Sequence, residues 1–197
     1  MRLAPLLLAA LFFPAAAETG TVVKVTVHGT VVYNQIRQAP LDTVRSGHKV
    51  DVSFLLNSDD YVNGSNFPTR GYVIDLPSYQ MAFKTTKVRL QSPFPVGEAA
   101  YFVLRNNDPA VDGFLVSRSA ETALGLPIQL AGSFGNGTSD FLATYGGTKL
   151  ASLDLLGALG THDFTGMSVF GFRMEDGSRV PMEIDFEWMK IEVVATS

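Results

Sequence analysis

Apolar and polar residues alternate along many short runs of this chain, and proline, glycine or Asn-Gly turns separate the runs. The first run, TVVKVTVHGTVVY, places the valines from Val23 to Val27 on one phase and polar residues on the other. The run GHKVDVSFLLN repeats the pattern from Val50 to Leu56. A period of two is typical of a β-strand with one buried face and one wet face. We therefore expect a chain built from strands.

Further strand candidates follow at short intervals, at 71–76, 79–84, 87–90, 99–105, 113–117, 128–134 and 141–145. A hairpin closes the chain, because MSVFGFRM and VPMEIDFEW flank an Asp-Gly turn. The segment 151–160 is the one plausible helix, but Gly157 interrupts it, and a single turn or a strand is the alternative. The many short strands, with 18 glycines and 10 prolines, predict an all-β fold. We expect an antiparallel β-sandwich of the jelly-roll type.

The N-terminal segment 1–17 has the three parts of a secretory signal peptide. Arg2 supplies a basic start, an apolar run from Leu6 to Phe13 follows, and alanines 15–17 form an A-x-A cleavage site. That run is too short to span a bilayer, and no later run approaches the necessary length. We expect residues 18–197 to form a single exported domain, periplasmic or extracellular, with no membrane span in the mature chain.

The composition excludes several classes of site. The sequence has no cysteine, which rules out zinc-thiolate centres, iron–sulfur clusters and cysteine nucleophiles. Without Arg2, 14 lysines and arginines stand against 19 acidic residues, so the mature chain carries a charge of −5. A negative chain without a basic run predicts no nucleic-acid partner. The three histidines are isolated in the sequence and lack the spacing of metal ligands.

A row of carboxylates near the C-terminus allows two interpretations. In MEIDFEWMKIEVV, Glu183, Asp185 and Glu187 alternate with large apolar residues. The acids could be catalytic, because residues two apart on a strand share a face and like charges raise one another's pKa. Alternatively they form the wet face of a strand whose apolar face, ending at Trp188, is core. The apolar phase inverts at Trp188 and Met189, which predicts a β-bulge there. We favour the second interpretation.

Two resemblances accompany these patterns. The segments SGHKVDVSFLLNS, YFVLRNNDPAVDGFLVS and SLDLLGALGTHDFTGMSVFGFRMEDGS resemble uncharacterised exported bacterial β-sandwich proteins that often carry a PEP-CTERM sorting tail. The final residues, IEVVATS, lack the Val-Pro-Glu-Pro-type motif of that tail. This resemblance implies export and a β-sandwich, and implies no chemistry.

The second resemblance is local. EIDFE is similar to the carboxylate strand of the laminarinase and lichenase family of glycoside hydrolases, which also fold as jelly rolls. It implies Glu183 as nucleophile, Asp185 as the acid that tunes it, and Glu187 as acid/base. The match covers five residues. In that family a long segment follows the strand and builds the cleft, whereas here ten residues follow Glu187.

Two polar loops could hold a structural calcium ion. NSDDYVNGSN contains Asp59 and Asp60, and RNNDPAVDGF contains Asp108 and Asp112. Clustered oxygen-bearing side chains suit calcium, although neither spacing fits an EF-hand. The same residues are the usual residues of solvated turns, which is the interpretation we favour. We expect no other cofactor.

These observations favour an exported, non-catalytic β-sandwich protein that binds a ligand or serves as a structural surface component. Carbohydrate is the leading candidate ligand, because 11% of the residues are aromatic and several aromatics lie in or beside loops. Another surface protein is the alternative partner. The competing functions are a glycoside hydrolase that uses Glu183 and Glu187, and a protein–protein module that uses a free sheet edge.

Overall fold

The computed structural model describes residues 20–107, 111–121, 126, 128–131, 138–146, 149–164, 169–176 and 179–194. The expected all-β, antiparallel fold is confirmed, since every strand pairing in this part of the chain is antiparallel. The predicted signal peptide, 1–17, lies outside the described residues. In the described ranges no helix is long and apolar enough to cross a membrane.

The strands are β1 (Val22–Asn34), β2 (Lys49–Asn63), β3 (Thr69–Ile74), β4 (Gln80–Phe83), β5 (Lys87–Val88), β6 (Tyr101–Arg105), β7 (Val111–Ser117), β8 (Ile128–Gln129), β9 (Thr138–Gly146), β10 (Gly160–Asp163), β11 (Val169–Asp176) and β12 (Arg179–Val193). Two short 3-10 turns, η1 (Leu76–Ser78) and η2 (Leu156–Ala158), accompany them. Of the interpretations of 151–160, the full helix is wrong and the single turn is confirmed, since η2 is the helical turn in that segment. The hydroxyl of Tyr72 instead accepts a hydrogen bond from the Leu155 amide and donates one to the Leu153 carbonyl.

The sheet curls until its pairings close into a circuit of eight strands, β1–β2–β3–β6–β7–β9–β11–β12 and back to β1. Strands β4 and β5 extend the sheet beyond β2, while β8 pairs with β9 and β10 with β12. Around the circuit the strands follow chain order, which is the connectivity of a meander. A jelly roll requires Greek-key connections. The described pairings therefore do not have the connectivity expected for a jelly roll, because each strand of the circuit pairs with the next one in chain order.

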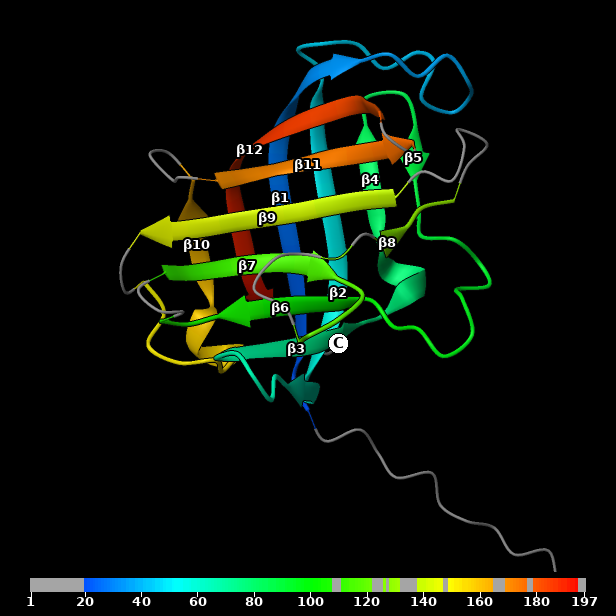
Figure 1. Cartoon of the computed structure of the whole chain (residues 1–197). Coiled ribbons are helices and arrows are strands. Elements are labelled where there is room, and N and C mark those ends of the chain that lie inside the picture. Colours follow the sequence, from blue (N-terminus) through cyan, green and yellow to red (C-terminus); the bar gives the residue numbers. More distant parts are fainter. Residues whose placement is uncertain are drawn as a thin grey trace, which may run out of the picture.

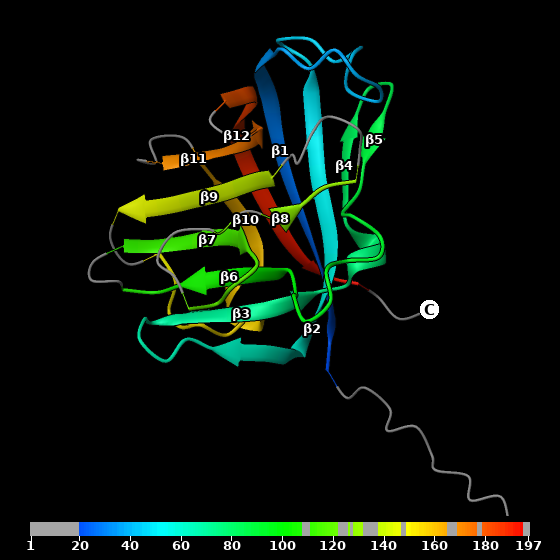
Figure 2. The same ribbon diagram turned by 45° about the vertical axis from the view of Figure 1, so that its right-hand side comes forward.

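Two sets of strands cross each other steeply in both views. Figures 1 and 2 show β3, β6, β7 and β9 running across β1, β2 and β4. Strand β2 belongs to both sets, since Asn57 pairs with β1 whereas Tyr61 pairs with β3. The register shifts between Leu56 and Tyr61, so an irregularity there turns the strand round the corner. The predicted polar loop NSDDYVNGSN, 57–66, is thus largely the end of β2 and part of a tight hairpin.

Apolar side chains from both sets of strands fill the space that the curled sheet encloses. The alternating valines of β1 and β2 are buried, as the sequence predicts. Phe54 of β2 contacts Phe102 of β6, with ring centroids 5.5 Å apart, and Phe102 stacks on Phe114 of β7. Burial of one such side chain is worth about 1.5–3 kcal/mol. Because the sequence has no cysteine, this packing must hold the fold without disulfides.

Candidate functional site

A β-bulge in β12 decides which residues reach the outer face of the sheet. His28 pairs with Trp188 and Gly29 pairs with Phe186, so Glu187 is an extra residue with no counterpart on β1. Phe186 and Met189 are both buried on either side of it. The predicted bulge exists, but it lies at Glu187 rather than at Trp188–Met189.

The position of the bulge corrects the prediction for Trp188. Ile184 and Phe186 are buried as expected, at 0% and 1% exposure. Trp188, expected in the core, is only half-buried, and its ring stacks on that of His28, with centroids 5.1 Å apart and planes 15° apart. The bulge shifts the phase before Trp188, so the indole joins the outer face and Met189 takes the core position.

The close approach of the two strands at the bulge requires a glycine. A Cβ atom at Gly29 would lie 2.4 Å from the backbone oxygen of Asp185, well inside any normal contact. The structure places the extra residue on the partner strand, and β1 keeps its alternation through Gly29, which is buried.

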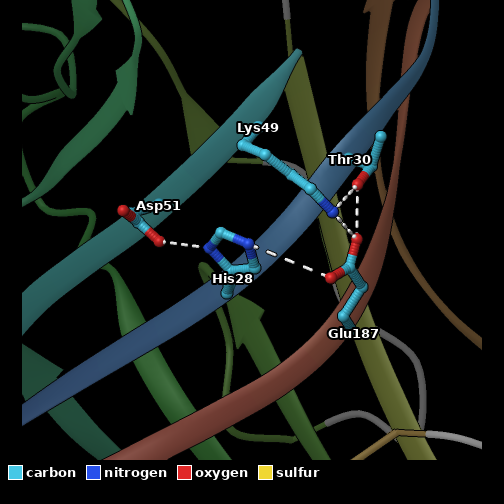
Figure 3. A network of polar contacts seen from close by, with 5 residues as sticks. All are labelled: His28, Thr30, Lys49, Asp51 and Glu187. Carbon is cyan, nitrogen blue, oxygen red and sulfur yellow. Dashed lines mark hydrogen bonds and ion pairs between the residues drawn. The ribbon is translucent and has the colours of Figure 1, made fainter. Parts of the chain in front are cut away.

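Five polar side chains meet on the outer face beside Trp188, and we call them the polar network: His28, Thr30, Lys49, Asp51 and Glu187 (Figure 3). His28 Nδ1 lies 2.7 Å from Asp51 Oδ1 and its Nε2 lies 3.9 Å from Glu187 Oε2. Lys49 Nζ donates to Thr30 Oγ1 at 2.7 Å and forms an ion pair with Glu187. The Thr30 hydroxyl donates to the same carboxylate. Three strands, β1, β2 and β12, thus contribute to one connected set of contacts.

The electrostatics of the network favour an ionised Glu187. Hydrogen bonds from Lys49, and next from Thr30, hold the pKa of Glu187 below its usual value. A carboxyl group that donates a proton in catalysis needs a raised pKa instead. The pairing of each charge also fixes the side chains of the network in place, since His28 lies between Asp51 and Glu187 in Figure 3.

The other two acids of the predicted row lie outside the network. Asp185 is exposed and Glu183 is half-buried, so the row faces outward as predicted. Glu183 lies 3.7 Å from the Arg173 Nε on β11. Burial, and then the charge of Glu183, raise the pKa of Tyr33. Glu183 and Glu187 are therefore engaged by different cations, Arg173 and Lys49.

A hollow of about 460 Å³ adjoins the polar network. Its lining shares Lys49 and Asp51 with the network and adds residues of the turn before β2 and of the end of β4: Gly47, His48, Ala82, Phe83 and Lys84. Gly47 has a φ of +83°, a conformation that glycine adopts without strain. The sequence singles out none of these residues as a site residue, because none belongs to a motif and they come together only in the folded chain.

Comparisons of the chain with protein-family models, with curated proteins and with solved structures give no match. The geometry of the outer face is therefore the guide to what this chain does.

Three of the four predicted calcium ligands, Asp59, Asp60 and Asp112, lie within the described residues. Asp112 is fully buried, and its carboxylate accepts hydrogen bonds from the backbone N–H groups of Asn107, Lys149 and Leu150. Asp59 and Asp60 are exposed on β2, and Asp108 lies outside the described residues. In the described part of the chain no three histidine or acidic side chains are grouped as metal ligands. Asp112 has the contacts of a structural anchor for the segment at 149–150.

Proposed function

We propose that this chain is an exported, non-catalytic binding protein whose ligand is a carbohydrate. The ligand would lie on the outer face of β12, β1, β2 and β4, where the polar network and Trp188 stand. We also propose a two-layer sandwich as the finer description of the fold. The crossing strand sets in Figures 1 and 2 and the Phe54–Phe102 contact support the two layers. The signal-peptide pattern at 1–17 supports export.

The observation that carries the proposal is a half-buried tryptophan beside a network of fixed charged groups. Sugars combine apolar C–H faces with many hydroxyl groups, so their sites pair aromatic rings with fixed hydrogen-bonding side chains. Trp188 supplies the aromatic ring, and stacking on His28 fixes its orientation. Asp51 and Glu187 supply acceptors whose side chains are already held by His28 and Lys49. Such prior ordering lowers the entropic cost of binding.

The glycoside-hydrolase alternative receives less support from the same geometry. A retaining enzyme needs one carboxyl group that stays protonated until it acts as the acid. Glu187, the residue assigned that role by resemblance, has a lowered pKa and an ion pair with Lys49. A protein–protein module would use an open sheet edge, and no described feature favours that function over carbohydrate binding.

A glycan array tests the proposal, with hydrolysis products measured in parallel. The parent should bind at least one class of glycan without cleaving it, and Trp188→Ala should lose most of that binding. Phe67→Ala is the matched control, because Phe67 is an aromatic residue that solvent reaches, at 38% exposure, and it lies on the β2–β3 hairpin. Equal loss in both variants, or hydrolysis that Glu187→Gln abolishes, would contradict the proposal.

A further inference from the structure

The hollow beside the polar network exists because two side chains leave space on the outer face. In the β2–β4 register, Asp51 pairs with Ala82 and Val50 pairs with Phe83. Lys49 and Lys84 are the next residues along these two segments of the chain. Ala82 has a small side chain, and Lys49 leans across β1 to reach Thr30 and Glu187 (Figure 3). The space above Ala82, between β2 and β4, is therefore left open to solvent.

The two lysines of the hollow differ in their electrostatic state. Lys49 is neutralised by Glu187. Lys84 is exposed, and it forms no ion pair with any residue in the described part of the chain. Among the described residues, nothing therefore compensates the positive charge on this side of the hollow.

The neighbouring side of the hollow carries hydrogen-bond acceptors. Asp51 is 54% exposed, and one of its carboxylate oxygens, Oδ1, is occupied by His28. Carboxylates in binding sites accept hydrogen bonds from hydroxyl groups, and charge-assisted bonds of this kind are the strong ones. Ala82 contributes apolar surface to the hollow, whereas Phe83 lines it but is 6% exposed and belongs to the core. The volume of about 460 Å³ lies within the range of small-ligand sites.

We infer that this hollow binds a carboxylated sugar, a uronic acid unit, with the carboxylate at Lys84 and the ring hydroxyls at Asp51. The inference rests on the proposed carbohydrate-binding function and assigns a ligand class to it. A neutral sugar would leave Lys84 without a counter-charge, and a simple anion would leave Asp51 and the apolar lining unused. A uronic acid carries the anionic group, the hydroxyls and the apolar ring face together.

The test measures binding of oligogalacturonate, of its neutral methyl ester and of a sulfated galactan by titration calorimetry. The parent should bind oligogalacturonate at least about tenfold more tightly than the methyl ester, since one charge-assisted contact is worth about a factor of ten. Lys84→Gln should remove that preference and Lys84→Arg should keep it. Lys24→Gln, which removes the same charge from an exposed position on β1, should leave it unchanged.

The outcomes separate this inference from the proposed function. Binding of neutral glycans that depends on Trp188 but shows no preference for the uronate would overturn the uronate assignment and leave carbohydrate binding intact. A preference for the sulfated galactan over oligogalacturonate would overturn the carboxylate as the recognised group. Equal losses in Lys84→Gln and Lys24→Gln would show a general charge effect and overturn the hollow as the site. Absence of any glycan binding would overturn both proposals.

Discussion

Replacement of Asp112 by alanine tests whether this buried carboxylate is a structural anchor. The side chain is fully buried, and three backbone N–H groups donate to it, including that of Leu150 at 2.6 Å and that of Asn107 at 2.9 Å. Alanine leaves all three donors without their acceptor. The Leu150 contact is buried, whereas those to Lys149 and Asn107 are only partly buried and can regain water.

These differences set the expected magnitude. A hydrogen bond to a charged group contributes about 1.5–3 kcal/mol net, and a buried donor without a partner costs about 1–3 kcal/mol. With one fully buried donor and two that recover water, we expect Asp112→Ala to lower the free energy of unfolding by about 3–4 kcal/mol. Asp112→Asn should lose less, because its amide oxygen still accepts.

Urea unfolding followed by the fluorescence of the single tryptophan measures this loss directly. Asp60→Ala, at an exposed site, is the control and should change stability by no more than about 0.5 kcal/mol. A loss below about 1 kcal/mol for Asp112→Ala would refute the anchor argument. A calcium-dependent stabilisation of the parent that disappears in the Asp112 variant would refute it too and restore the metal-site interpretation.

Three further predictions concern the bulge and its neighbours. Phe186→Ala should cost about 3–5 kcal/mol in urea unfolding followed by circular dichroism, because its ring is buried. By the same measurement Trp188→Ala should cost about 1–2 kcal/mol, because the indole is half-buried and loses chiefly its stacking on His28. Equal losses would contradict the placement of Trp188. Gly29→Ala should cost about 1–3 kcal/mol, since the added Cβ forces β12 away, and an unchanged melting temperature would contradict that contact. The lowered pKa of Glu187 stabilises the fold above its ordinary value of 4.5, and this contribution is lost as the pH falls through the lower folded-state pKa. Glu187→Gln should therefore flatten the acid limb of the stability–pH curve slightly, and a steeper limb would refute the sign.

Much of the fold was predictable because alternation is a local signal. The buried valines of β1 and β2 and the outward acids of β12 follow directly from it. The strand conformation of segment 57–63 was not predictable, because its polar residues gain it from pairing with β3 at the corner. The predicted jelly-roll connectivity has no local signal at all, since it depends on which strands become neighbours.

The candidate site was largely beyond sequence reasoning for a related reason. Thr30 and Glu187 are 157 residues apart in the chain, and only the β1–β12 pairing brings them together. The bulge was predicted at Trp188–Met189 but lies at Glu187. This small displacement reverses the face of Trp188, so the prediction placed the indole in the core and not at the surface. His28, Lys49 and Asp51 occupy ordinary polar positions on their strands. Their register across β1 and β2 is what makes them a network.

The most direct test of the central claim is a binding measurement with the purified chain on a glycan array that contains neutral, carboxylated and sulfated oligosaccharides. We expect retention of a glycan class without cleavage, with the carboxylated members bound most tightly and with the signal lost in Trp188→Ala but kept in Phe67→Ala. An array without any bound glycan, or a signal that survives unchanged in Trp188→Ala, would contradict carbohydrate binding by the outer face of β12, β1, β2 and β4.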